Sequence, residues 1–355
     1  MAYRMVQVGT GGFGAAWCRS FLPPNVKEGL IEVVAAVDMK EEAHVHAVEG
    51  LGLSASQCYT SLEKALDENP ADFLTVVVPP AHHEAVVDAA LAHDLHILSE
   101  KPIADTLATA CRIVDKVARS GKKMGITMSH RYDQDKTSLR EQIRSGRWGP
   151  LDYLVAKYLC NNRRFGSWGK FRHEIPDPLM IEAGVHYFDL LADMAGAKCD
   201  TVYAQTWNPP WGEFAGDSQA LVTMHYDNGT RAFFEGAKTN AWGLNCACQE
   251  YLRAECEGGT LILDHRKLGV FPYDPDLPSG DGGERQPEPL SLLEQPKWGH
   301  TWLIEEFVHW LDGGEPMETK VEDNLESLAI VFAAIESSRT GEPVKVQEFL
   351  GSASR

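Results

Sequence analysis

The sequence is poor in positive charge. Its 355 residues contain 33 Lys and Arg against 51 Asp and Glu, which leaves a formal net charge of −18. Nucleic-acid-binding proteins present basic surfaces to phosphates, and docking on anionic membranes also needs basic residues. The deficit therefore argues against nucleic acid and against a membrane surface as partners. An anionic small substrate is still allowed, because a few arginines outweigh the overall field inside one pocket.

Long hydrophobic runs and paired cysteines are also missing. No apolar stretch approaches the roughly 20 residues that cross a bilayer, and we expect no signal peptide at the start of this sequence. None of the eight cysteines forms a Cys-x-x-Cys pair. This usage favours scattered, mostly buried free thiols and a cytoplasmic location. His44 and His46 have no third candidate ligand nearby, so we expect no metal site.

The first third of the chain alternates strand and helix patterns. Helical segments are expected at 14–22, where Pro23-Pro24 would end the helix, and at 84–93. The expected strands are continuous apolar runs at 5–8, 31–37, 73–78, 95–98 and 123–128. Apolar strands separated by helices predict a parallel sheet covered on both faces.

From about residue 151 the pattern changes to longer, more strongly alternating strands. They are expected at 151–160, 201–207, 219–226, 231–238 and 250–256, with a surface loop at 271–298 and helices at 301–311 and 323–338. Such strands are typical of a mostly antiparallel sheet with one open face. The length suits two domains. We therefore expect an α/β protein with a doubly wound parallel sheet, the Rossmann fold, over 1–125. An α+β domain for substrate binding and oligomerisation is expected over 126–355.

A glycine-rich turn follows the first strand. Gly9-Thr10-Gly11-Gly12-Phe13-Gly14 fits G-x-G-x-x-G and opens a helix. In this motif Gly9 makes the tight turn, Gly11 lets the backbone approach a pyrophosphate, and Gly14 lets the helix pack closely on the strand. Asp38 ends the next strand, where a carboxylate accepts hydrogen bonds from ribose hydroxyls and repels a 2′-phosphate. The pattern predicts NAD rather than NADP as the cofactor.

Two further motifs carry charged groups that suit chemistry. Glu100-Lys101-Pro102 follows an expected strand, at the sheet edge where ligands bind in open α/β folds. Glu182 and His186 lie four residues apart on an expected helix over 180–191, so they share one face. A carboxylate beside an imidazole suits it to act as a general base. The alternatives are that Glu100 and Lys101 are a charge pair in solvent and that His186 is a structural residue.

In this order the motifs resemble the Gfo/Idh/MocA family of NAD(P)-dependent sugar oxidoreductases. The resemblance rests on Gly9–Gly14, Asp38, Pro79-Pro80 with His83, Glu100-Lys101-Pro102, Gly184-Val185-His186 with Asp189, and the segment 323–344. It implies that Phe13, Pro80, His83 and Glu100 join the glycines in binding the cofactor. It also implies that Lys101, before a cis peptide bond, lies between the nicotinamide and the substrate hydroxyl, and that His186 is catalytic. Many members carry Asp where this chain has Glu182, which would bind substrate or orient His186.

A basic, aromatic cluster stands out between residues 163 and 173. Arginine forks match anionic groups and aromatic rings stack on sugars. In the family this connection covers the substrate, which suggests an anionic sugar, although salt bridges to the acidic body are an equal alternative. Including a second candidate after the strand at 123–128, the expected substrate-binding residues are Arg131, Arg163, Arg164, Trp168, Arg172 and His173.

We therefore expect an NAD-dependent oxidoreductase that acts on a secondary alcohol of a sugar, sugar derivative or cyclitol and forms a homo-oligomer, a dimer or tetramer. Lys101, His186 and Glu182 are the expected catalytic residues. A second interpretation uses the same residues in an NAD-dependent glycosidase. Transient oxidation at C3 of an anionic glycoside, such as a sulfo-sugar or uronide, would allow elimination and then water addition. A ligand-sensing regulator is disfavoured, because both Lys101 and His186 are present.

Overall fold

The computed structural model describes residues 2–277 and 285–353. They form two compact units, one made of residues 2–132 and 296–325 and the other of the remainder. The continuous domains expected from the sequence, 1–125 and 126–355, differ from these units because residues 126–132 and 296–325 belong to the first unit.

The first unit is built on a six-stranded parallel sheet. Its strand order is β3-β2-β1-β4-β5-β6, which is the Rossmann order. The strands are β1 (Tyr3–Val8), β2 (Ile31–Val37), β3 (Cys58–Tyr59), β4 (Phe73–Val76), β5 (His96–Ser99) and β6 (Met124–Ile126). The expected parallel sheet is thereby confirmed. Because the strands are parallel, the carboxyl ends of β1, β2, β4 and β5 lie on the same side of the sheet.

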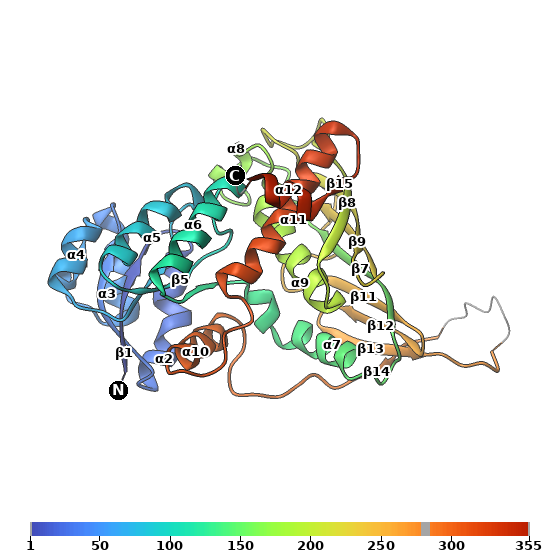
Figure 1. Cartoon of the computed structure of the whole chain (residues 1–355), viewed down its shortest axis with the longest axis horizontal. Helices are drawn as coiled ribbons and strands as arrows, with labels where there is room; N and C mark the ends of the chain where they lie inside the picture. The colour runs from blue at the N-terminus through green and yellow to red at the C-terminus, as the bar shows by residue number, and fades with distance from the viewer. Residues whose placement is uncertain (1, 278–284, 354–355) are drawn as a thin grey trace. The chain divides into compact units, whose positions relative to one another are not determined.

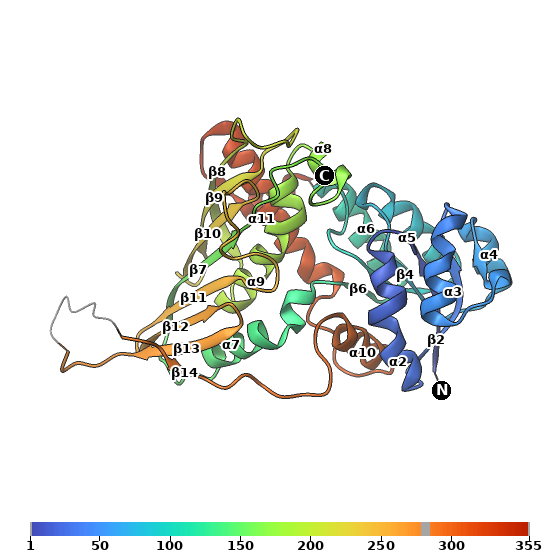
Figure 2. The same cartoon turned by 180° about the vertical axis from the view of Figure 1, so that it is seen from behind.

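Helices cover both faces of this sheet, as expected for continuous apolar strands. The α-helices are α1 (Gly14–Ala16), α2 (Leu22–Lys27), α3 (Val45–Leu51), α4 (Leu62–Glu68), α5 (His83–Ala92), α6 (Leu107–Ser120) and α10 (Gly299–Leu311). Short helical turns are η1 (Trp17–Phe21), η2 (Glu41–His44), η3 (Ala55–Gln57), η4 (Pro80–His82) and η5 (Ser129–Tyr132). Figure 1 shows α5 and α6 on one face, and Figure 2 shows α2 and α3 on the other.

The first helix continues beyond the prolines that were expected to end it. A π-helical turn, η1, separates α1 from α2, and α2 begins at Leu22 with proline in its first turn. Proline is tolerated there because the amide N–H groups of a first turn have no partner within the helix. The helix therefore runs to Lys27 rather than stopping at Pro23-Pro24.

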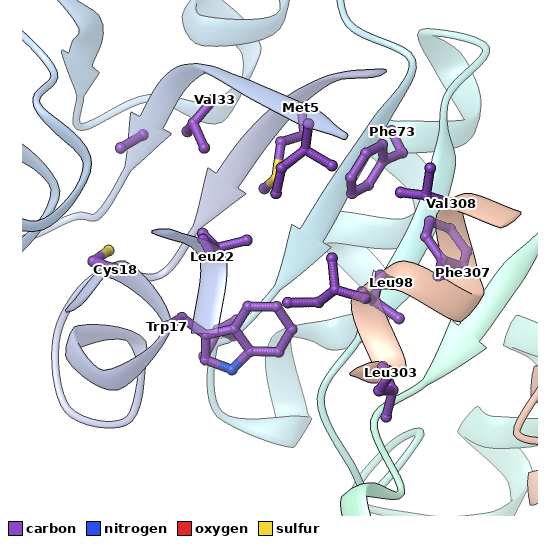
Figure 3. Packing of buried hydrophobic residues seen from close by; sticks show 14 of the residues in the cluster. Met5, Trp17, Cys18, Leu22, Val33, Phe73, Leu98, Leu303, Phe307 and Val308 are labelled. Atoms are coloured by element: carbon purple, nitrogen blue, oxygen red, sulfur yellow. The ribbon is translucent and has the colours of Figure 1, made fainter. Parts of the chain in front are cut away.

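Residues 296–325 complete the core of the first unit. Helix α10 buries Leu303 and Phe307 fully, and the Phe307 ring meets the ring of Phe73 on β4 with centroids 5.4 Å apart. Figure 3 shows Phe307 beside Phe73, in the cluster that also contains Trp17 and Leu98. This packing explains why a segment so late in the sequence belongs to the first unit.

The second unit contains a nine-stranded mixed sheet, in the order β14-β13-β12-β11-β7-β10-β9-β8-β15. Its strands are β7 (Leu151–Leu159), β8 (Cys199–Trp207), β9 (Gln219–Tyr226), β10 (Arg231–Ala237), β11 (Tyr251–Cys256), β12 (Gly259–Asp264), β13 (Lys267–Pro272), β14 (Glu288–Pro289) and β15 (Val344–Lys345). Within the described part of this nine-stranded sheet, β7 and β10 are the one parallel pair. The expected, mostly antiparallel sheet is confirmed.

The second unit also contains helices. They are α7 (Gln134–Arg144), α8 (Lys170–Glu174), η6 (Leu179–Gly184), α9 (Val185–Ala195), α11 (Val321–Thr340) and α12 (Val346–Ala353), of which α11 begins in the first unit. Figures 1 and 2 show α7, α9 and α11 along the sheet. On β9 buried residues alternate with the exposed Leu221, Thr223 and His225, so the opposite face is open, as expected.

Some expectations about the second half need correction. Strands β12 and β13 were not expected, and β14 interrupts the expected surface loop over 271–298, of which residues 278–284 lie outside the described residues. All eight cysteines are free thiols, as expected, but only Cys18, Cys160 and Cys199 are buried, so the expectation that most are buried is wrong. Within the described residues, no helix is long and apolar enough to span a bilayer.

Candidate active site

The glycine turn after β1 leaves no room for side chains at its two ends. Gly9 has φ +89°, and a Cβ there would lie 2.0 Å from the carbonyl oxygen of Val77. A Cβ on Gly14 would lie 2.3 Å from the oxygen of Gly9, whereas one on Gly12 would meet nothing within 4 Å. The backbone at Gly12 therefore faces open space at the start of a helix. This geometry fits the pyrophosphate of a dinucleotide.

Asp38 anchors the same turn from the end of β2. Its Oδ2 accepts hydrogen bonds from the N–H groups of Thr10 and Gly11, both at 2.9 Å, and its Oδ1 accepts one from Lys40 at 3.0 Å. Burial raises the pKa of Asp38, but these backbone hydrogen bonds outweigh burial and lower the pKa below its usual value. A charged carboxylate beside the turn suits the ribose diol of NAD.

The turns after β4 and β5 are joined by a buried histidine. The His83 ring nitrogens lie 2.9 Å from the oxygen of Val78 and 3.1 Å from that of Ile103. Desolvation lowers the pKa of His83. Its side chain is fully buried, so these contacts support the turn that begins at Pro80, and cofactor binding by either residue stays a prediction. The expected cis peptide between Lys101 and Pro102 is confirmed.

Glu100 is held by two side chains that sequence reasoning did not find. Its Oε1 accepts the indole N–H of Trp17 at 2.9 Å and lies 3.5 Å from Nε2 of His300. Burial raises the pKa of Glu100, but His300 and then Lys101 counter it, and the pKa lies below its usual value. Trp17 and His300 are 83 and 200 residues away from Glu100, and neither belongs to a motif, so no local pattern pointed to them.

In the second unit, the histidine helix differs from the expected one. Its first turn is the π-helix η6, and α9 begins at Val185, so the α-helical face expected for Glu182 and His186 does not extend through that turn. Glu182 is buried, and its Oε2 accepts a hydrogen bond from Arg172 Nε at 2.9 Å. Asp189 on α9 accepts one from Ser327 Oγ at 2.7 Å, which ties α9 to α11.

The basic cluster makes contacts within its own unit. Arg164 pairs with Glu213 at 2.9 Å, and Arg163 Nε donates to the backbone oxygen of Thr239 at 2.8 Å. His173 is buried and stacks on Phe214, with ring centroids 4.0 Å apart. These positions suit salt bridges and loop packing, the alternative that the sequence left open.

Lys238, at the end of β10, was also missed. Its side chain is fully buried, and Nζ donates a hydrogen bond to the hydroxyl of Tyr158 and lies 3.3 Å from the ring centroid of Trp168. The guanidinium of Arg172 lies 5.2 Å from the same ring. Two cations thus lie near the ring of Trp168. In the sequence, the one signal for this site was a lysine at the end of an expected strand.

Arg131, the remaining expected substrate contact, belongs to the first unit. It lies in η5 and is buried, and its Nη1 is 3.5 Å from the backbone oxygen of Glu318. None of these observations tests its role or those of Lys101, His186 and Glu182, which stay predictions.

Two domain models of one known protein family match this chain. Residues 3–128 match the NAD-binding Rossmann fold of an oxidoreductase family, and residues 140–346 match the C-terminal alpha/beta domain of the same family. The uncharacterized protein y4oX of Sinorhizobium fredii is 48% identical over 99% of this chain and 98% of its own. An inositol 2-dehydrogenase of Streptomyces avermitilis is 34% identical over 96% of this chain and 93% of its own.

Solved structures share the fold at lower identity. An oxidoreductase from Agrobacterium radiobacter, in complex with NAD+, L-tartaric acid and magnesium, superposes with a TM-score of 0.80 at 19% identity, over 98% of this chain and 99% of that one. The WlbA dehydrogenase from Bordetella pertussis, in complex with NADH and UDP-GlcNAcA, gives 0.80 at 19% identity, over 97% and 99%. At this identity the likeness concerns the fold.

Proposed function

Because the chain belongs to the Gfo/Idh/MocA oxidoreductase family, with its NAD-binding Rossmann domain, we propose that it is a dehydrogenase of cyclitols or sugars. The substrate group is a secondary alcohol, and the cofactor is NAD. The observation that carries the proposal is the 34% identity, over 96% of this chain, to a relative named as an inositol 2-dehydrogenase. The glycine turn and Asp38 support it, because together they form a cradle for a dinucleotide without a 2′-phosphate.

Each proposed catalytic residue has one task. His186 accepts the proton of the substrate hydroxyl, and the Lys101 ammonium stabilises the negative charge that develops on that oxygen. The C–H bond of the carbinol carbon breaks as the carbonyl forms. NAD+ would supply the hydride acceptor for this C–H bond when bound. In the reverse reduction the same residues return the proton to the oxygen.

The contacts of the basic cluster favour a neutral polyol over an anionic sugar. Arg164 and Arg172 each face a carboxylate of their own unit, at 2.9 Å in both cases. An anionic substrate would have to compete with Glu213 and the buried Glu182 for these guanidinium groups. Glu182, fixed by Arg172, supplies a carboxylate that accepts hydrogen bonds from substrate hydroxyls.

We also propose that the chain forms a homo-oligomer, a dimer or tetramer, through the open face of the nine-stranded sheet. That face carries a hollow lined by residues including Tyr153, Tyr203 and Phe233, so apolar and aromatic groups are available to a second copy. Light scattering coupled to size-exclusion chromatography measures the mass. A monomer at micromolar concentration contradicts the proposal.

The dehydrogenase is tested by incubating the purified protein with NAD+ or NADP+ and a panel of substrates. The panel contains myo-, scyllo- and D-chiro-inositol, neutral aldoses, uronates, and glycosides of sulfo-sugars and uronates. NADH formation with NAD+ and a neutral polyol is expected. Sugar release from a glycoside without NADH accumulation would instead favour the glycosidase, and no reaction with any polyol contradicts the proposal.

A lysine pair tests the assignment of Lys101. Lys101→Ala is expected to lower kcat at least ~1000-fold and to change the Kd for NAD+ by no more than about threefold, since its charge acts on the transition state. Lys64→Ala is the control, because Lys64 is 64% exposed and pairs with Glu68 on the surface of α4. Unchanged turnover in Lys101→Ala removes the central assignment.

A further inference from the structure

His300 lies in the first turn of α10, in the segment that returns to the first unit. Its ring stacks on Phe21, with centroids 4.1 Å apart and an interplanar angle of 4°. It also meets Phe13 and Trp17 edge-on, at centroid distances of 5.6 and 5.8 Å. Because Phe13 belongs to the glycine turn, His300 contacts the segment expected to bind the cofactor phosphates.

A nitrogen at the edge of the same ring faces Glu100. Nε2 of His300 lies 3.5 Å from Oε1 of Glu100, and the two side chains are only 13% and 9% exposed. Trp17 donates its indole N–H to the same oxygen, at 2.9 Å. A carboxylate removed from water needs such partners, and charge-assisted contacts of this kind are the strong ones.

Glu100 is in turn connected to the backbone that carries Lys101. Its Oε2 accepts the N–H of Lys101 at 3.3 Å, and its own N–H donates to the oxygen of Val76 at the end of β4, at 2.8 Å. The carboxylate therefore spans the gap between His300 and the peptide that leads into Lys101. A change in its direction moves that peptide.

We propose that His300 is a positioning residue: it fixes the Glu100 carboxylate, and through it the direction of Lys101, while bracing the glycine turn. The inference rests on the proposed dehydrogenase, because it assigns Lys101 the task given above. In this role His300 acts on Lys101 through Glu100. It does so through the ring nitrogen that lies 3.5 Å from the carboxylate and through the ring face that stacks on Phe21.

Two variants separate the nitrogen from the ring. His300→Phe keeps an aromatic ring for the stack on Phe21 but has no donor toward Glu100. His300→Gln loses the ring but keeps an N–H group at a similar reach. If His300 were only a packing residue, the phenylalanine would replace it better than the glutamine.

Kinetics with a polyol oxidised by the wild-type protein give the first readout. His300→Phe is expected to lower kcat on the order of 10- to 100-fold, the effect of a misplaced catalytic group, with KM and the Kd for NAD+ within about threefold. His300→Gln is expected to retain more than about a third of kcat. Trp17→Phe, which removes the second donor to the same oxygen, is expected to show the same split as His300→Phe.

A second readout does not need a substrate, so it also serves if the panel shows no dehydrogenase activity. Reductive methylation with ¹³C-formaldehyde labels lysines, and loss of one signal in Lys101→Arg assigns Lys101 by NMR. In the NAD+ complex this signal is expected to shift in His300→Phe and to keep its wild-type position in His300→Gln. A Lys101 signal at its wild-type position in both His300 variants overturns the proposal. In the kinetics, an equal fall of kcat in His300→Phe and His300→Gln overturns it. So does a kcat that stays within twofold of the wild type in His300→Phe and Trp17→Phe.

Discussion

The bond between Trp17 and Glu100 gives a sharp test of the buried site. The indole nitrogen lies 2.9 Å from Oε1 of a carboxylate that is almost fully buried. Hydrogen bonds to charged groups contribute about 1.5–3 kcal/mol net. Trp17→Phe removes the donor and also leaves a small void, so a single variant mixes two effects. Glu100→Met removes the acceptor but also changes the desolvation and the pairing with His300, so this single variant mixes several effects as well.

A double-mutant cycle isolates the bond. Four proteins are compared: wild type, Trp17→Phe, Glu100→Met, which has no acceptor for the indole N–H, and the double variant. Because packing losses cancel, the coupling free energy reports the contact between the two side chains, and we expect about 1–2 kcal/mol. The control is the same kind of cycle in the second unit, with Trp148→Phe and Gln142→Met, because the indole N–H of Trp148 donates to the neutral amide oxygen of Gln142 at 3.2 Å. The coupling free energy of this neutral pair is expected to be about 0.5–1.5 kcal/mol.

Urea unfolding at pH 7, followed by far-UV circular dichroism, measures these energies. If the two units unfold separately, added NAD+ stabilises the transition of the unit that binds it and so identifies the first unit. A coupling energy below about 0.3–0.5 kcal/mol, the error of additivity for independent sites, would refute the reasoning. The indole would then be only a packing group, and Glu100 would be held by its other partners.

Three further predictions concern the cofactor cradle and one surface pair. Gly9→Ala is expected to abolish NAD binding in a fluorescence titration, because its Cβ would lie 2.0 Å from a backbone oxygen. Gly351→Ala on α12, whose Cβ would meet no atom within 4 Å, should leave NAD binding unchanged; equal losses in the two variants contradict the cradle geometry. Asp38→Asn should reduce the preference for NAD over NADP by about tenfold or more, measured as the ratio of Kd values, because the charge that repels a 2′-phosphate is removed; an unchanged ratio removes Asp38 from cofactor selection. Hydrogen bonding to Arg112 is the main effect that lowers the pKa of Glu84 to about 2. Since a depressed pKa stabilises the fold above the usual value near 4.5, Glu84→Gln should lower Tm by about 2–4 °C at pH 7, and the difference should shrink as the pH falls toward 2; a constant difference contradicts the ion pair.

The sequence predicted the parts of the structure that depend on local patterns. The glycine turn, Asp38 and the Lys101–Pro102 peptide follow strands whose apolar runs are continuous, so their place at the sheet edge was predictable. His300 was not, because its partner Glu100 is 200 residues away and the contact depends on α10 returning to the first unit. Periodicity predicts a helix such as α10 but not its partner.

Two errors in the secondary structure predicted from the sequence have physical causes. The hairpin β12–β13 turns at His265 and Arg266, both with positive φ, where Asn-Gly or Asp-Gly is the usual signal. The π-helical turn before α2 places Pro23-Pro24 in a first turn, which proline tolerates, so the proline pair marked a restart of the helix rather than its end.

The return of residues 296–325 to the first unit has a consequence for synthesis on the ribosome. The strands from β1 to β6 emerge first, but Leu303 and Phe307, which cover Phe73 and Leu98, are made only after the whole sheet of the second unit except β15. At roughly 5–20 residues per second, translation from residue 132 to residue 296 takes on the order of 10–30 s. During that interval the nascent first unit exposes the apolar surface that α10 later buries. The order of translation thus makes the nascent N-terminal half a substrate for chaperones that hold apolar chains.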